Sequence, residues 1–526
     1  MGADTHRQQV AAQDERSSLS SSEPRASARA IVREPADLRQ GEEESPDSEE
    51  TLVRRIEAFL LEPDAGRARA LRRAIAADYA DAITEVAQAL GEAKLWQRPE
   101  ALEGSLTLEA GSDSARVSIT YRLPRDYDPL RPYPMLLLLK EGGVEPDRLL
   151  ESARERFGPA VQSMILAGVA VRADPPPFRF DAVNDWMLET LEALRRRFHV
   201  DEDRVYLTGA GEDGDAAWLI GLMFPESFAG VWVESACPRL PYIEQSGRLL
   251  IDNLRNVTFV SRWGDPPWEE EQAVSANRAV RMAWCNHRLA TFAGEKGISL
   301  YKAVFRSPEH VSKSEGDPTS VRGGRRVDAS RGRTPAARNE RMEHAGVAGR
   351  QDETAIRQGS RSSGKGAFSK AVEEAKAEFL AARRLAWPRQ AVKWFRYPQQ
   401  GNLGMVEVLR MSGEPWTGSQ LSLRPAPQTD ADDWITRVFR DLLGYVAVEV
   451  RGQTVAIETR RVERLAVYFS DEWVDLDRPV TVTINGRRRF EGRVKRNVDT
   501  LLDFARAHWR FSDLPVSRKV FRLRER

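Results

Sequence analysis

The chain has 526 residues and balances 79 Lys and Arg against 79 Asp and Glu, for a formal net charge of zero. At roughly 150 residues per domain, this length allows three or four domains, or two domains with disordered segments. Without a global basic field, nucleic acid is not the default partner. Two cysteines, Cys237 and Cys285, exclude a disulfide framework and a Cys-rich zinc site.

The N-terminal stretch lacks the apolar segment of a secretory signal. No apolar run reaches the roughly 18 to 20 residues that span a bilayer. We therefore expect a soluble, cytoplasmic protein that does not contact membranes.

The first 50 residues are polar, end in an acidic run and contain no aromatic residue, so we expect disorder there. Residues 51–103 are expected to form a helical N-terminal segment, because Leu52, Ile56 and Phe59 recur at helical spacing.

From residue 104 the pattern changes to alternation and then to continuous apolar runs at 135–140 and 165–173. Such runs are typical of strands buried on both faces. Strand-like and helix-like segments then alternate as far as residue 305. The order predicts an α/β fold over 104–310, with a mostly parallel sheet flanked by helices and ligands bound at the carboxyl ends of its strands.

Residues 311–366 are rich in Arg, Ser and Gly and contain no Phe, Tyr or Trp. We expect a disordered basic insertion; as the alternative, residues 313–366 form an arm that makes weak contact with polyanions such as nucleic acid. Residues 367–395 are predicted to be a helical connector. Residues 396–526 are predicted to be a small β-rich C-terminal domain, with a hairpin at Asn485-Gly486.

The segment 200–225 carries the most information about function. A predicted strand ends in TGAGEDGDAAW and a predicted helix follows. That is the setting of a nucleophile elbow, where a tight turn presents a side chain above the sheet.

Here the chain resembles a bacterial esterase or peptidase of the α/β-hydrolase superfamily, near its dienelactone-hydrolase and depolymerase-like branches. The resemblance covers roughly residues 105–310 and 390–526. The stretches that carry it are YRLPRDYDPLRPYPMLLLLKEGG, RRRFHVDEDRVYLTGAGEDGDAAW, FPESFAGVWVESACPRL, LRNVTFVSRWGDPPW and VERLAVYFSDEWVDLDRPVTVTINGRRRFEGRV. It implies an α/β-hydrolase-like sheet, a Ser-His-acid triad and a β-rich appendage.

The elbow departs from the family pattern Gly-x-Ser-x-Gly-Gly. The matching positions here are Gly209, Ala210, Gly211, Glu212, Asp213 and Gly214. The nucleophile position falls on Gly211, which has no side chain. Acyl transfer by this mechanism needs a hydroxyl or thiol whose proton a histidine can take.

The loop that the resemblance implies to form the oxyanion hole also departs from the family pattern. The family has a histidine followed by glycines, and this chain has Lys140, Glu141, Gly142 and Gly143. Glu141 would bring a negative charge to a pocket that stabilises an anion. Glu212 and Asp213 would add two carboxylates at the elbow.

The resemblance places the triad acid at Asp265 and the triad histidine at His310, as remnants of a degenerate triad. Both residues also fit ordinary loop positions. No cofactor and no metal are expected, because the chain has neither a Gly-rich phosphate loop with Lys nor zinc-ligand spacing.

Other chemistry at this edge stays open. Glu212, Asp213 and Asp215 together with Glu141 could form a carboxylate pair or a hard-cation site, or simply a solvated acidic loop. Ser235 and Cys237, near the end of the next strand, are less favoured candidates for a substitute nucleophile.

The interpretation that these observations favour is a pseudohydrolase: an α/β-hydrolase-like scaffold that has lost its nucleophile and acts in binding, with an unknown small ligand or protein as partner. The alternative is an active serine-type esterase or peptidase-like hydrolase with a displaced nucleophile.

Overall fold

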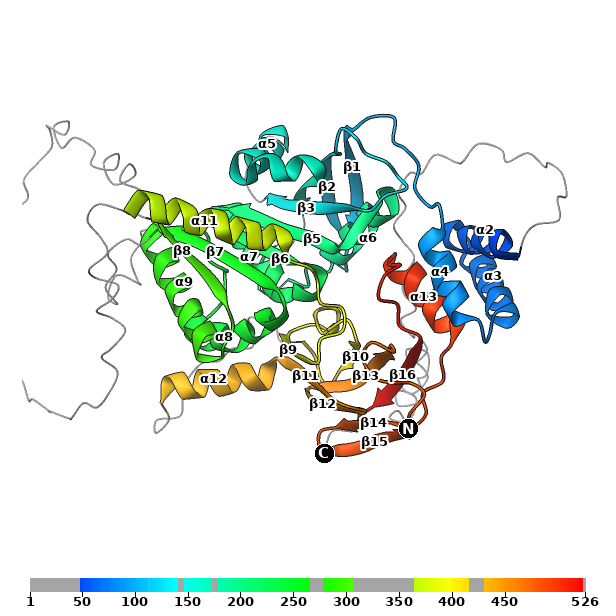
Figure 1. Cartoon of the computed structure of the whole chain (residues 1–526). Coiled ribbons are helices and arrows are strands. Elements are labelled where there is room, and N and C mark those ends of the chain that lie inside the picture. The colour runs from blue at the N-terminus through cyan, green and yellow to red at the C-terminus, as the bar shows by residue number, and fades with distance from the viewer. Residues whose placement is uncertain are drawn as a thin grey trace, which may run out of the picture.

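The computed structural model describes residues 48–112, 114–140, 146–172, 178–180, 182–264, 278–305, 364–415 and 430–523 (Figure 1). The segments predicted to be disordered, residues 1–50 and 311–366, lie almost wholly outside this part of the chain. Those two predictions, and the alternative of a polyanion-binding arm at 313–366, therefore stay predictions.

The centre of the molecule is an eight-stranded sheet with the order β1-β2-β4-β3-β5-β6-β7-β8. β1 and β2 pair antiparallel, β2 pairs antiparallel with β4, and every pairing from β4 to β8 is parallel. The strands are β1 (Glu103–Ala110), β2 (Ala115–Arg122), β3 (Tyr133–Lys140), β4 (Ile165–Arg172), β5 (Val200–Ala210), β6 (Gly230–Glu234), β7 (Thr258–Gly264) and β8 (Leu300–Phe305).

The continuous apolar sequence of β3 explains its central place. Met135, Leu137 and Leu139 join one hydrophobic cluster, and Leu136 and Leu138 join another on the opposite face. All five are 0 or 1% exposed. A strand apolar on both faces needs helices on both sides, so this run predicted a covered parallel sheet.

Helices cover both faces of the sheet (Figure 1). One face packs against α6 (Trp186–Arg197), α7 (Glu212–Met223), α8 (Ile243–Leu250) and α9 (Arg278–Glu295). The other packs against α5 (Pro146–Phe157) and α11 (Gly364–Ala381). The short 3₁₀ turns are η1 (Gly158–Ser163), η2 (Pro225–Ser227), η3 (Ile251–Asn256) and η5 (Pro398–Gln400).

The helical connector predicted for 367–395 needs correction. The helix ends at Ala381, and Gln390–Phe395 forms β9. Pro388 cannot continue a helix, and the sequence QAVKWF that follows it suits a strand. α11 is also part of the α/β layer, because Phe379 is fully buried against Phe157 and Trp232.

The C-terminal region contains two sheets, of three strands (β10-β13-β16) and five strands (β15-β14-β12-β11-β9). The additional elements are β10 (Val406–Met411), α12 (Ala431–Leu442), β11 (Gly444–Arg451), β12 (Thr454–Arg460), β13 (Val462–Phe469), β14 (Val480–Ile484), β15 (Arg487–Gly492), α13 (Val498–His508) and β16 (Ser517–Arg522). A mostly parallel sheet flanked by helices and followed by a β-rich region confirms the predicted fold class.

Two elements of this region differ in how well the sequence predicted them. The hairpin predicted at Asn485-Gly486 joins β14 to β15, with positive φ angles of 51° and 73° at these residues. α12 was not predicted from the sequence. It packs against α8 through Phe439. Its signal was the helical spacing of Trp434, Ile435 and Phe439 within a region rich in strands.

The N-terminal helices are α2 (Ser48–Leu61), α3 (Ala65–Asp78) and α4 (Ile83–Glu92). Their apolar faces share one hydrophobic cluster with α13, from the other end of the chain. Ile56 and Val86 meet Leu501 and Leu502 there, and all four are fully buried. The N-terminal helical segment is therefore completed by the C-terminal region (Figure 1).

A buried ion pair joins β9 to the α/β part. The ammonium group of Lys393, which is 0% exposed, bonds the carboxylate of Glu226 and the carbonyl oxygen of Asn402. Burial lowers the pKa of Lys393 and raises the pKa of Glu226, so burial disfavours both charges. Asn253 lies beside the pair and binds the backbone of Leu222 and Trp394.

We expect Lys393→Met to lower the free energy of unfolding by about 3–5 kcal/mol, because it leaves the carboxylate of Glu226 buried without its cation. The double variant Lys393→Met, Glu226→Leu should regain most of that loss. Urea unfolding followed by tryptophan fluorescence measures both. A double variant no more stable than the single one would contradict this account of the junction.

His508 ends α13 against the ring of Phe504, with ring centroids 4.4 Å apart. Burial, reinforced by Arg510, Arg195 and Arg518, lowers the pKa of His508 to about 3. The folded protein therefore binds this proton less readily than the unfolded chain, whose histidine titrates near 6.5.

The stability contributed by neutral His508 should thus be complete above pH 6.5 and fall as the pH drops below it. Relative to His508→Gln, we expect the wild type to lose roughly 0.5–1 kcal/mol per pH unit between pH 6 and 4. Urea titrations of both proteins at several pH values measure this difference. A difference that does not vary with pH would contradict a neutral, buried imidazole.

Candidate functional site

The turn between β5 and α7 has the geometry of an elbow. Gly211 links them with φ 61° and ψ −125°, a backbone conformation that residues with side chains rarely adopt. Its N–H donates to the carbonyl oxygen of Glu234 at 2.9 Å, and its carbonyl oxygen accepts from the N–H of Asp215 at 3.1 Å. The turn is therefore tied to the end of β6 and to the first turn of α7.

Flanking glycines make this turn sterically feasible. A Cβ atom at Gly209 would overlap the backbone of Asp213, and one at Gly214 would lie 2.6 Å from the Cβ of Ala236. A Cβ at Gly211 would meet nothing within 4 Å. The chain thus has the close strand-to-helix approach of an elbow, while Gly211, where the resemblance implies a nucleophile, has open space and no side chain.

One acidic residue at the elbow, Asp215, is held by arginines. It is 4% exposed, and its oxygens accept from Arg278 through two contacts of 3.0 and 3.1 Å and from the N–H of Cys237 at 2.9 Å. Arg239 lies 3.6 Å from the same carboxylate. Glu212 is exposed. The carboxylate of Asp215 therefore fixes two arginines and the loop after β6 to the start of α7, and the carboxylate pair suggested by the sequence stays a prediction.

A second arginine network lies at the same edge of the sheet. Glu234, the last residue of β6, binds Arg262 at 2.9 Å, Arg156 at 3.4 Å and the indole N–H of Trp232 at 2.8 Å. Arg156 also donates to the hydroxyl of Thr208 on β5. Burial lowers the pKa of Arg156, and the field of Glu234 acts against that shift. The positive charges of these arginines therefore offset the negative charges of Asp215 and Glu234 at this edge of the sheet.

Beneath the edge, Asn286 of α9 organises the polar groups between the strands. Its carbonyl oxygen accepts from the indole of Trp218 at 3.2 Å and from the hydroxyl of Ser261 at 2.7 Å. Its amide donates to the carbonyl oxygens of Ala236 and Met282. The side chain is 1% exposed and holds β7, α7 and the loop after β6 in one network.

Cys237 and Cys285 form a disulfide bond. The sequence did not predict this pairing, which removes Cys237 as a substitute nucleophile while the bond is intact. The bond fixes the loop after β6 to α9, beside Asn286. Structural disulfides persist mainly in oxidising compartments, so the pairing argues against the cytoplasmic expectation.

The structure describes only part of the predicted site. Lys140 ends β3 at the same edge as the elbow and is half-buried. Asp265, His310 and the loop residues Glu141, Gly142 and Gly143 lie outside the described residues. The roles predicted for them remain predictions. The sequence did not predict the arginine partners, the role of Asn286 or the disulfide. These contacts join residues more than 20 positions apart, and no local pattern indicates them.

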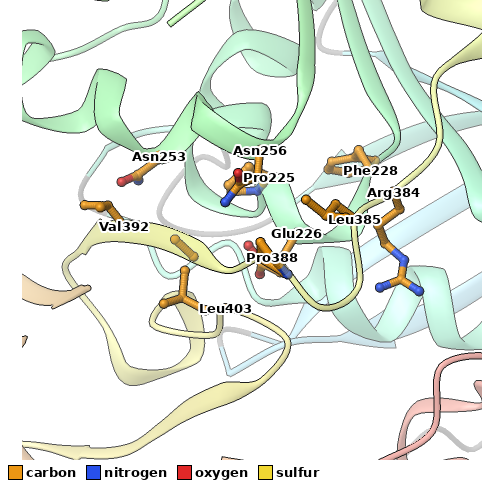
Figure 2. A pocket seen from close by; sticks show the side chains of 11 residues that line it. Pro225, Glu226, Phe228, Asn253, Asn256, Arg384, Leu385, Pro388, Val392 and Leu403 are labelled. Atoms are coloured by element: carbon orange, nitrogen blue, oxygen red, sulfur yellow. The ribbon is translucent and has the colours of Figure 1, made fainter. Parts of the chain in front are cut away.

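Two cavities lie away from this edge of the sheet. One of about 30 Å³ is enclosed by Pro225, Asn253, Arg384, Pro388 and Leu403, at the junction of η2, η3 and the chain that leads to β10 (Figure 2). It has room for one or two water molecules. A second, open hollow of about 400 Å³ lies in the β-rich region between Gly452 and Trp473.

Within the described ranges, no cluster of His, Cys, Asp and Glu could hold a metal ion. Over the same ranges, no helix has the length and apolar character needed to cross a membrane.

No family model and no curated protein matches the chain. Solved structures do. A thermostable esterase is 16% identical, with 40% of this chain and 56% of that chain covered and a TM-score of 0.29. A ferulic acid esterase is 15% identical over 39% and 90% of the two chains, with a TM-score of 0.28. A putative dipeptidyl aminopeptidase IV from Bacteroides ovatus is 13% identical over 39% and 32%, with a TM-score of 0.31.

This chain spans about half of the thermostable esterase and a third of the aminopeptidase. These three structures are two esterases and one aminopeptidase, and each is less than 20% identical to this chain.

We expect reduction of the disulfide, or the pair of variants Cys237→Ser and Cys285→Ser together, to lower the free energy of unfolding by about 2–4 kcal/mol. Thiol titration of the protein unfolded without reductant should detect no free thiol, and two after reduction. Two free thiols before reduction would contradict the pairing.

Proposed function

We propose that this protein is a catalytically degenerate α/β-hydrolase-like scaffold that acts by binding a small ligand or a protein partner rather than by hydrolysis. The observation that carries the proposal is Gly211: the elbow geometry is retained, and the nucleophile position has no side chain.

The chemistry of the neighbouring groups supports this proposal. An acyl-enzyme forms only when an oxygen or sulfur atom attacks the carbonyl carbon from the turn. The carboxylate of Asp215 does not supply that atom, because it is bound to Arg278 and Arg239.

One observation favours the alternative of an active hydrolase with a displaced nucleophile. Ser235 directly follows the residue that binds the N–H of Gly211, is exposed and has a positive φ of 49°. Strained backbone of this kind is found at functional sites. Its hydroxyl could serve as nucleophile if a histidine from outside the described residues reached it.

The proposal is tested by hydrolysis of short-chain p-nitrophenyl esters by the wild type, Gly211→Ser and Ser235→Ala. We expect no turnover above the buffer rate for the wild type and for Ser235→Ala. Gly211→Ser should fold, since a Cβ there meets nothing within 4 Å. It should nevertheless lose about 1–3 kcal/mol of stability because of the positive φ.

Turnover by the wild type that Ser235→Ala abolishes would overturn the proposal and identify the displaced nucleophile. A gain of several orders of magnitude in Gly211→Ser alone would mean that the rest of the catalytic machinery is intact. In that case the loss of activity rests on a single substitution.

A further inference from the structure

Two arginines lie opposite each other in the three-stranded sheet β10-β13-β16. Arg464 of β13 pairs in register with Arg522 of β16. Residues directly opposite one another on neighbouring strands project from the same face of a sheet. The two guanidinium groups therefore form a row across adjacent strands, which lie about 4.8 Å apart. Arg410 of β10 also pairs with Arg464, at a place where the register shifts on both sides.

Such a row opposes folding when nothing neutralises it. Like charges directly opposite one another destabilise a strand pair. Arg410 has a carboxylate partner, Glu463, at 3.0 Å. Arg464 and Arg522 are exposed, and among the described residues neither has a carboxylate within ion-pair distance. Their positive charges are therefore open to solvent.

The basic character extends along β16 and around its edge. On the same face of β16, Arg518 and Val520 alternate with Arg522; Arg518 has a carboxylate partner, Glu407, at 3.6 Å, and Val520 is 47% exposed. On the opposite face, the ammonium group of Lys519 lies 4.1 Å from the ring centroid of Phe490 in β15. The two strand edges are therefore neighbours, as their positions in Figure 1 also indicate.

β15 brings three more arginines to that edge. Arg487, Arg488 and Arg489 are all exposed, and of these only Arg488 has an ion pair within the described chain, with Glu491. Residues 487–523 contain 11 Lys or Arg and 4 Asp or Glu, in a chain whose net charge is zero. Positive charge is thus segregated to one part of a neutral protein. We call Arg464 and Arg522, which project from one face of the three-stranded sheet, the basic face.

The chemistry of this face selects among anionic partners. Guanidinium groups match phosphate oxygens with paired hydrogen bonds. Val520 is the exposed large apolar residue of the face, which gives a lipid bilayer little to bury. Phe490 and Phe521 are half-buried against the core and provide no platform for base stacking. A repeating phosphate backbone, read without regard to sequence, fits these features best.

We propose that the basic face binds the phosphodiester backbone of duplex nucleic acid independently of sequence. This function is separate from the hydrolase-like edge of the large sheet. Binding occurs through charge, so it weakens steeply with salt, and each arginine that contacts a phosphate contributes about 0.9 to the slope of log K against log salt.

The test is fluorescence anisotropy of a fluorescein-labelled 20-base-pair DNA duplex with the full-length protein at 50–200 mM salt. The variant is Arg464→Thr, Arg522→Thr, because threonine suits an exposed strand. The matched control is Arg69→Thr, Arg73→Thr, which removes two exposed arginines of α3. Further arms measure polyglutamate and phosphatidylserine vesicles under the same conditions.

We expect the wild type and the α3 control to bind the duplex at 50 mM salt, and the basic-face variant to bind about tenfold more weakly with a salt slope lower by about 2. The melting temperature of the basic-face variant should equal or exceed that of the wild type, because a like-charge pair is removed. Weaker binding then does not reflect unfolding.

The proposal would be overturned by no duplex binding at 50 mM salt, by equal binding of the basic-face variant and the wild type, or by binding only to polyglutamate or to vesicles. Binding that survives in the basic-face variant and disappears when residues 313–366 are deleted would also overturn it and assign the contact to that segment.

Discussion

The close approach of α7 to the end of β5 determines what the rest of the molecule can do. It is possible only because Gly209 and Gly214 lack side chains, and it forces Gly211 into a positive φ. The hydrogen bond from Gly211 to Glu234 then fixes β6 against the turn, and Glu234 in turn orders Arg156 and Arg262. A turn of this shape presents whatever side chain it carries at the carboxyl edge of the sheet, and here it carries none.

The sequence predicted well those features that depend on neighbouring residues. The apolar run of β3, the hairpin at Asn485 and the glycine-rich turn before α7 are local signals, and each lies where it was expected. Features that depend on distant pairing were missed. The acid cluster could not be interpreted correctly from sequence, because Arg278 lies 63 positions from Asp215.

The same distinction applies to domains and to charge. α13 completes the core of the N-terminal helices from the far end of the chain, and α11 returns to cover the large sheet after a long separation in sequence. Net charge misleads in a similar way: the total of zero excludes a global basic field and conceals the segregation of arginines on β15 and β16. Only strand register brings Arg464 opposite Arg522. The two proposed roles thus lie on different sheets and can be separated by mutation.

The proposal that this edge of the sheet holds no activated nucleophile is tested most directly by covalent labelling. The wild-type protein would be incubated with a fluorophosphonate in excess and analysed by intact-protein and peptide mass spectrometry, with an active serine esterase as the positive control. The account predicts an unmodified mass while the control is fully labelled. A stoichiometric adduct on one residue, Ser235 above all, would contradict it and show that the scaffold still holds an activated nucleophile.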